Sequence, residues 1–185
     1  MSDSTRRILG IDPGTNILGF AVIEIIQRQV KVLSFDVLRL GAAESPYHKL
    51  KRIYECVQEV IDAHRPGEMA IEAPFYGPNV QSMLKLGRAQ GVAIAAAISK
   101  GLEVTEYSPK KVKQSVTGNG NASKEQVAAM LANQFKLDFS DHYFDATDAL
   151  AVAMCHYYQH QLTGTGKKRY SGWEDFVKNN PDKRG

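Results

Sequence analysis

The hydrophobic and polar positions near the amino terminus predict β-structure. A short apolar run over residues 8–11 stops at Asp12-Pro13-Gly14, which is a turn signal. Two longer runs, residues 17–25 and 30–40, are rich in Val, Ile, Leu and Phe. The polar residues 27–29 between them predict a hairpin. The first forty residues are therefore expected to form three strands.

Beyond residue 45 the apolar positions change to helical spacing. Leu50, Ile53 and Val57 recur at intervals of three and four, and Ser45-Pro46 predicts the N-cap and the first helical residue. A later helix is expected to begin at Ser123, where Gln126 completes a capping box. The remaining predicted elements are strands over residues 69–72 and 102–107 and helices over residues 79–100 and about 144–160.

This order of elements predicts an α/β domain with a mixed five-stranded sheet flanked by helices. We assign residues 1–162 to this domain and residues 163–185 to a basic C-terminal tail. No apolar run approaches the length of a membrane span, the start lacks the apolar stretch of a signal peptide, and two cysteines give no disulfide framework. We therefore expect a cytoplasmic protein without a membrane partner.

Four carboxylates stand at positions where a charge is unexpected. Asp12 and Glu72 end predicted buried strands, and Asp145 and Asp148 share one face of the last helix. Taken singly, each of these acids also has a purely structural interpretation. Asp12 fits the first position of a turn, and Asp145 fits an acid that complements the helix dipole. If the four converge, each close pair costs ~4 kcal/mol at ~4 Å and an effective dielectric of ~20, so several together need cations or protons. Oxygen ligands suit Mg²⁺ or Mn²⁺, and two such ions activate a water for phosphodiester cleavage.

The sequence around these acids resembles the RuvC family of Holliday junction resolvases. The resemblance covers about residues 6–160, and the segments that carry it are ILGIDPGT (8–15), AIE (70–72), LKLGRAQGVA (84–93) and DATDALA (145–151). It implies a ribonuclease H-like fold and a homodimer that nicks four-way DNA junctions symmetrically in recombination and repair, leaving 5′-phosphate and 3′-hydroxyl ends. It also implies a branch-migration motor as a partner.

The resemblance further implies roles for individual residues. The metal-binding and catalytic tetrad would be Asp12, Glu72, Asp145 and Asp148, holding two Mg²⁺ ions for which Mn²⁺ can substitute. Phe75 is our match for a residue that stacks on bases at the junction, with Tyr76 beside it. Lys113 and Lys124 match lysines near the family's active site, where one orients the water or stabilises charge in the transition state.

Basic residues are concentrated in the middle of the chain. Residues 76–124 carry a local charge of +5, although residues 1–160 as a whole hold 17 basic and 17 acidic residues. Without the four carboxylates, residues 1–160 would carry +4, so low net charge does not argue against DNA. A solvated face is the alternative interpretation of these lysines. The candidate DNA-binding residues are Phe75, Tyr76, Lys85, Arg88, Lys110, Lys111, Lys113 and Lys124.

Two further sequence features bear on assembly and metal binding. Gly87 and Gly91 thin one side of the second predicted helix. They suit either packing on the protein's own sheet or, as the resemblance implies, a face for self-association. His156 and His160, four residues apart near the end of the last helix, are expected to interact with its C-terminal carbonyls.

Two other classes of function remain open at this stage. The Asp12-x-Gly14-Thr15 segment also resembles the phosphate loop of actin-like ATPases and sugar kinases, which need two such domains around a nucleotide cleft. The second alternative is a module that binds branched DNA without cutting it. The full set of four carboxylates favours chemistry over binding alone.

Overall fold

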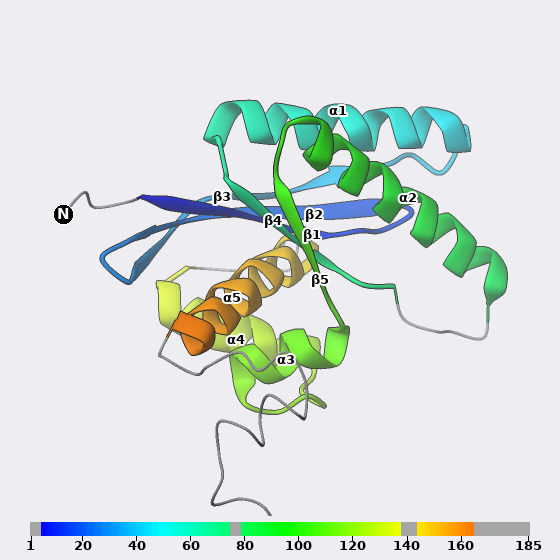
Figure 1. Cartoon of the computed structure of the whole chain (residues 1–185). Helices are drawn as coiled ribbons and strands as arrows, with labels where there is room; N and C mark the ends of the chain where they lie inside the picture. Colours follow the sequence, from blue (N-terminus) through cyan, green and yellow to red (C-terminus); the bar gives the residue numbers. More distant parts are fainter. Residues whose placement is uncertain (1–4, 75–78, 138–143, 165–185) are drawn as a thin grey trace, which may run out of the picture.

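The computed structural model describes residues 5–74, 79–137 and 144–164, with the backbone alone for 144 and 162–164. Its centre is a five-stranded sheet in the order β3-β2-β1-β4-β5 (Figure 1). β2 pairs antiparallel with β1 on one side and with the edge strand β3 on the other, whereas β1, β4 and β5 run parallel to one another. The predicted mixed sheet is therefore confirmed. The strands are β1 (Arg6–Asp12), β2 (Ile17–Ile26), β3 (Gln29–Arg39), β4 (Glu68–Glu72) and β5 (Glu103–Tyr107).

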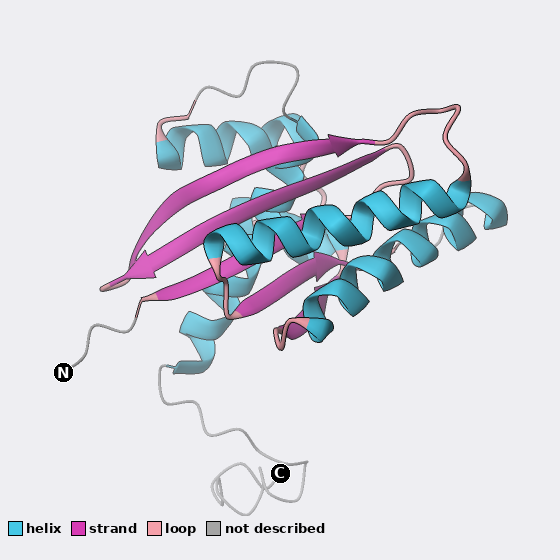
Figure 2. Cartoon of the chain, turned by 90° about the horizontal axis from the view of Figure 1, so that it is seen from above, coloured by secondary structure: helices cyan, strands magenta, loops and turns pink. Residues whose placement is uncertain are grey.

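Helices cover both faces of this sheet. Figures 1 and 2 show α1 and α2 on one face and the other helices on the opposite face. Successive side chains of β1 point to opposite faces of the sheet. Leu9 and Ile11 therefore pack in the core beneath α1 and α2, whereas Ile8 packs in the core beneath the helices on the opposite face. The helices are α1 (Pro46–His64), α2 (Val80–Ser99), α3 (Pro109–Thr117), α4 (Lys124–Phe135) and α5 (Phe144–Gly164).

The capping signals in the sequence are confirmed, and one helix was missed. The Ser45 side chain accepts a hydrogen bond from the backbone N–H of His48, and Ser123 forms the predicted capping box with Gln126. Helix α3 was not predicted, although Ser108-Pro109 repeats the Ser-Pro signal that begins α1. Nine residues give too few turns for a clear hydrophobic period.

The turn between β2 and β3 has two residues in the left-handed backbone conformation and is contacted by a side chain of α5. Gln27 and Arg28 have φ values of 51° and 67°, a backbone conformation that residues other than glycine and asparagine seldom adopt. The hydroxyl of Tyr157, on α5, donates a hydrogen bond of 2.9 Å to the carbonyl of Arg28. This tertiary contact helps to hold a turn that its own residues do not favour.

No helix within the described residues is both long and apolar enough to cross a bilayer. Phe75, Tyr76 and nearly all of the predicted tail, residues 165–185, lie outside the described residues, so the predictions for them stay predictions.

Candidate active site

Two of the predicted carboxylates meet because their strands are parallel neighbours. In the ladder between β1 and β4, Ile11 is opposite Ile71, so the next residue of each strand, Asp12 and Glu72, ends at the same sheet edge. Side chains at the carboxyl ends of parallel strands are a common place for functional groups. The sheet topology therefore brings together two acids that are sixty residues apart in the sequence.

The other two acids reach this edge because α5 lies directly on β1 and β2. A Cβ added to Gly19 would stand 2.0 Å from the carbonyl oxygen of Asp145, and one added to Gly10 would stand 2.2 Å from that of Ala149. Gly19 is also opposite Asp12 in the ladder between β1 and β2. Only glycine at these two strand positions permits so close a helix. Neither glycine was predicted to have this role from the sequence, although an isolated glycine within a strand is a signal of close backbone approach.

Three of the four carboxylates form one potential metal site. One oxygen each from Asp12, Asp145 and Asp148 lies within 4.8 Å of the others. Glu72 lies outside this group of three but lines the same pocket, of about 270 Å³, as Asp12 and Asp148. Three of the four predicted acids therefore converge, and Glu72 lines the pocket beside two of them.

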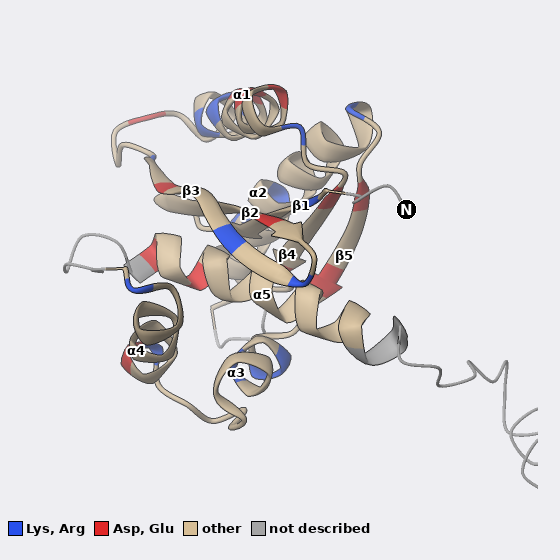
Figure 3. Ribbon diagram, turned by 90° about the vertical axis from the view of Figure 1, so that its left-hand side faces the viewer, with Lys and Arg blue, Asp and Glu red and all other residues tan. Residues whose placement is uncertain are grey.

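Lysines complete the pocket. Lys113 of α3 and Lys124, the first residue of α4, both line it. The ammonium of Lys124 donates a short hydrogen bond to Oδ2 of Asp148. Figure 3 shows acidic positions near the start of α5 and basic positions on α3 and α4, which lie on the same side of the sheet. The two lysines that sequence analysis placed near the catalytic centre are therefore beside the carboxylates.

Burial and mutual repulsion destabilise the ionised carboxylates of the pocket. Burial raises the pKa of Asp12 well above its ordinary value, and the charges of Glu72 and Asp148 raise it further. Burial, followed by the charge of Asp148, raises the pKa of Glu72 to about 7. Although desolvation opposes it, the hydrogen bond that Lys124 donates to Asp148 raises the pKa of Lys124. A divalent cation would relieve the repulsion among the acids, and a set of oxygen ligands suits Mg²⁺ or Mn²⁺.

The other predicted DNA-binding residues lie away from this pocket. Lys85 and Arg88, on α2, line a separate cavity of about 500 Å³, which Lys49 of α1 also lines. Lys49 was not among the predicted DNA-binding residues. Lys110 and Lys111 are exposed on α3 and do not line the carboxylate pocket. The basic residues therefore divide into a pair at the site and others on nearby surfaces.

The raised pKa of Glu72 predicts a pH-dependent stability in the absence of divalent cations. The folded protein holds a proton on Glu72 up to about pH 7, whereas the unfolded chain releases it near pH 4.5, so this contribution is lost as the pH rises through 7. At about 1.36 kcal/mol per pKa unit, the effect amounts to at most about 3 kcal/mol. We expect the melting temperature in EDTA to fall less steeply between pH 5 and 8 for Glu72→Gln than for the wild type.

The difference in pH dependence between the wild type and Glu72→Gln gives the contribution of Glu72 separately from that of other groups that titrate in the same pH range. His156 is one of them, because burial lowers its pKa and makes the folded state more stable as the pH rises. Equal pH slopes for the wild type and Glu72→Gln would show that this carboxyl is not desolvated as described.

Comparisons with known proteins agree with this site. A family model described as "Crossover junction endodeoxyribonuclease RuvC" matches residues 8–156. Proteins of that name from Cytophaga hutchinsonii and Christiangramia forsetii are 56% and 53% identical to the chain, over 96% and 97% of its length and 88% and 93% of theirs. The structure "T. thermophilus RuvC in complex with Holliday junction substrate" superposes with a TM-score of 0.78 at 31% identity, covering 85% of this chain and 96% of that one. Together with the sheet order, this match confirms the predicted ribonuclease H-like fold. The chain therefore belongs to the RuvC family of crossover junction endodeoxyribonucleases.

Proposed function

We propose that the protein is a structure-selective endonuclease that resolves Holliday junctions in DNA recombination and repair. The paired symmetric nicks would leave 5′-phosphate and 3′-hydroxyl ends. The observation that carries the proposal is the convergence of Asp12, Asp145 and Asp148 at a pocket lined by Glu72 and Lys124, in a chain that belongs to this family. The cytoplasm is the proposed compartment, and a branch-migration motor is a proposed partner.

The ligands proposed for two Mg²⁺ ions, or Mn²⁺ in their place, are Asp12, Asp145, Asp148 and Glu72. When bound, the ions would activate a water molecule and stabilise the leaving 3′ oxygen of the scissile phosphodiester. The chain itself supplies the rigid arrangement: Asp12 stands at a strand end, and Gly19 lets the first turn of α5 approach it. Such preorganisation means that the site needs little rearrangement during the reaction.

A mobile four-way junction and a linear duplex of the same sequence, each labelled on one strand, test this function. We expect paired nicks at symmetric positions of the junction with Mg²⁺, an intact duplex, and no cleavage of either substrate in EDTA. Ligation of the products without prior treatment would identify the 5′-phosphate and 3′-hydroxyl ends. Tight binding to the junction without any Mg²⁺-dependent nicks would instead support the non-cutting module.

Lys124 is proposed to stabilise negative charge in the transition state, because its ammonium already faces the carboxylate site. We expect Lys124→Ala to lower the cleavage rate about a hundredfold, the magnitude typical of losing one preorganised electrostatic group, with nearly unchanged junction affinity. Single-turnover cleavage and binding in Ca²⁺ would be measured side by side. Lys113→Ala is expected to act in the same direction.

Lys111→Ala is the matched control, since Lys111 is exposed on α3 and does not line the pocket. Its loss should weaken binding slightly and reduce the dependence of affinity on salt, as expected for a phosphate contact. A rate defect of Lys124→Ala that disappears at saturating protein would reduce Lys124 to a similar backbone contact.

DNA is proposed to cover the sheet edge that carries the carboxylates. The proposed phosphate contacts come from α2, α3 and the start of α4, and Phe75 with Tyr76 would stack on bases at the crossover. Lys49, which lines the same cavity as Lys85 and Arg88, joins this proposed surface. The residues proposed to contact phosphate are Lys49, Lys85, Arg88, Lys110, Lys111, Lys113 and Lys124.

We propose that α2 forms the interface of a homodimer. A Cβ on Gly87 or Gly91 would meet no heavy atom within 4 Å among the described residues outside the helix itself, so these glycines do not pack on the chain's own sheet. On the same helix, Leu84 and Ile98 are 54% and 60% exposed. A two-fold dimer through this apolar face would present two identical sites to a two-fold symmetric junction, which accounts for symmetric nicking.

Gly91→Asp is expected to weaken dimer formation at least a hundredfold without disturbing the fold of each protomer. The new side chain has open space in the protomer but would place a charge within the apolar interface. Sedimentation velocity over a range of protein concentrations measures the effect. Gly67→Asp is the control, because Gly67 also has open space among the described residues and lies off α2. Dimerisation equal in both variants would contradict an interface on α2.

A further inference from the structure

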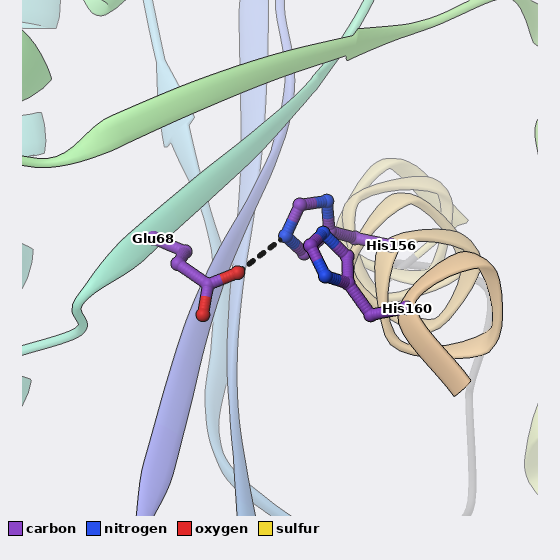
Figure 4. A group of neighbouring side chains, drawn as sticks. All are labelled: Glu68, His156 and His160. Carbon is purple, nitrogen blue, oxygen red and sulfur yellow. Dashed lines mark hydrogen bonds and ion pairs between the residues drawn. The ribbon is translucent and has the colours of Figure 1, made fainter. Parts of the chain in front are cut away.

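A second cluster of potential ligands lies far from the carboxylate site along the same two elements. Glu68 is the first residue of β4, whose last residue is Glu72. His156 lies eight residues beyond Asp148 on α5, about 12 Å along the helix axis at about 1.5 Å per residue. Figure 4 shows His156 and His160 extending from α5, with a ring nitrogen of His156 directed at the carboxylate of Glu68.

The three side chains are close enough to share one ion. Nε2 of His156 lies 2.7 Å from Oε2 of Glu68, and the imidazole rings of His156 and His160 have centroids 4.4 Å apart. One ligand atom from each residue lies within 4.8 Å of the other two. His156 therefore does not contact the C-terminal carbonyls of α5, as the sequence had suggested, but faces the sheet.

We propose that Glu68, His156 and His160 form a binding site for a transition-metal ion and that Zn²⁺ is its best match. Two histidines at positions i and i+4 of a helix with a carboxylate from another element form a common set of zinc ligands. His160 is exposed, so a water molecule can complete a tetrahedral site. Imidazole ligands disfavour Mg²⁺ and Ca²⁺, which distinguishes this site from the all-oxygen pocket.

The residues around the cluster already hold two of the three ligands in place. The hydroxyl of Tyr107 lies 2.9 Å from Nδ1 of His156, which leaves Nε2 directed at the site. Arg6 donates hydrogen bonds of 2.6 and 2.5 Å to the two oxygens of Glu68. Partners of this kind orient metal ligands in known sites. Arg6 also offsets the charge of Glu68, so the affinity must come mainly from the two imidazoles, as Zn²⁺ favours.

Binding requires only a small adjustment. Two ligands about 2.0–2.1 Å from a tetrahedral ion are separated by about 3.3 Å, so the contact between His156 and Glu68 must open by about half an ångström. His156 is 2% exposed and cannot move far, whereas the exposed side chain of His160 can rotate toward the ion. The bound ion would tie the later turns of α5 to the start of β4.

Zinc titration of the full, untagged and metal-stripped chain tests the site. Saturating Mg²⁺ would be present to occupy the carboxylate pocket, and isothermal calorimetry would give the stoichiometry and affinity. We expect one equivalent of Zn²⁺ to bind to the wild type and to Asp148→Asn with equal affinity. His160→Gln should bind at least thirtyfold more weakly and retain its fold, because this side chain is exposed.

His48→Gln is the matched control, since His48 is an exposed histidine on α1, and it should bind Zn²⁺ like the wild type. The melting temperature should rise with Zn²⁺ in the wild type and in His48→Gln but not in His160→Gln. Substitution by Co²⁺ should give the intense visible absorption of a tetrahedral complex only where His160 is present.

Three results would overturn the proposal. They are zinc binding by His160→Gln with wild-type affinity, loss of zinc binding in Asp148→Asn, and no zinc binding by the wild type. The second result would place the ion in the carboxylate pocket.

Discussion

Asp148→Asn is expected to lower the rate of junction cleavage at least a thousandfold while junction affinity changes by no more than a few fold. Asp148 supplies one of the three oxygens that converge at the potential metal site, and it is also the partner of Lys124. An amide preserves the shape of the side chain but removes its charge, so the affinity for divalent cations falls. Losses of this order are those measured when one member of a set of catalytic groups that act as a unit is removed.

The measurement is single-turnover cleavage of a four-way junction in Mg²⁺, paired with binding in EDTA. Asp12→Asn, Glu72→Gln and Asp145→Asn should show the same separation of cleavage from binding. Asp62→Asn is the matched control, because Asp62 pairs with Lys100 on an exposed surface. This variant should retain the full cleavage activity of the wild type. If binding were lost together with cleavage, and the circular dichroism changed, the carboxylate would be structural.

Removal of a buried charge should also stabilise the metal-free protein. Because burial and neighbouring carboxylates raise the pKa of Asp12, its ionised form opposes folding at neutral pH. A higher melting temperature of Asp12→Asn in EDTA, together with lost cleavage, would mark a site kept for function at the expense of stability. A substitution that breaks a structural hydrogen bond would lower the melting temperature instead.

Gly19→Ala is expected to destabilise the protein by about 1–3 kcal/mol or more and to abolish cleavage, although the residue carries no reactive group. Its new Cβ would stand 2.0 Å from the carbonyl oxygen of Asp145, and backbone cannot move aside as a flexible side chain does. The first turn of α5 must shift away from β2, which separates Asp145 and Asp148 from Asp12. Gly10→Ala should act similarly, through its contact with Ala149.

Chemical denaturation and junction cleavage would be measured together for each variant. Gly67→Ala serves as the control, because its Cβ has open space among the described residues and its N–H can still donate to the carbonyl of Arg7. We expect this control to retain wild-type stability within about 0.5 kcal/mol. Wild-type stability and cleavage in Gly19→Ala would contradict the close contact between α5 and the sheet.

Local signals accounted for most of the secondary structure and for the identity of the acids. Ser45-Pro46 and the pair Ser123 and Gln126 marked helix starts correctly because capping depends on residues within one turn. Helix α3 was missed because it is short, and its single buried residue, Val112, leaves no period to detect. The four carboxylates were recognised by their positions at strand ends and on one helix face.

His156 shows where such reasoning failed. A pair near the end of a helix suggests contacts with the terminal carbonyls, but the N-terminal end of β4 lies beside α5 and provides Glu68 as the partner of His156. Glu68 and His156 are 88 residues apart, so no local pattern relates them. The potential metal site proposed at this cluster depends wholly on that juxtaposition.

The sequence by itself determined the alternation of strands and helices, the caps that begin two of the helices and the four acids, because each depends on side chains close together in the chain. The tertiary structure alone decided that Asp12 and Glu72 share a sheet edge, since this follows from the parallel pairing of β1 with β4. It also decided how closely α5 approaches, because Gly10 and Gly19 act through the space they leave for a helix more than a hundred residues away. Convergence of like charges is a property of packing, and packing depends on contacts between residues that are distant in the sequence.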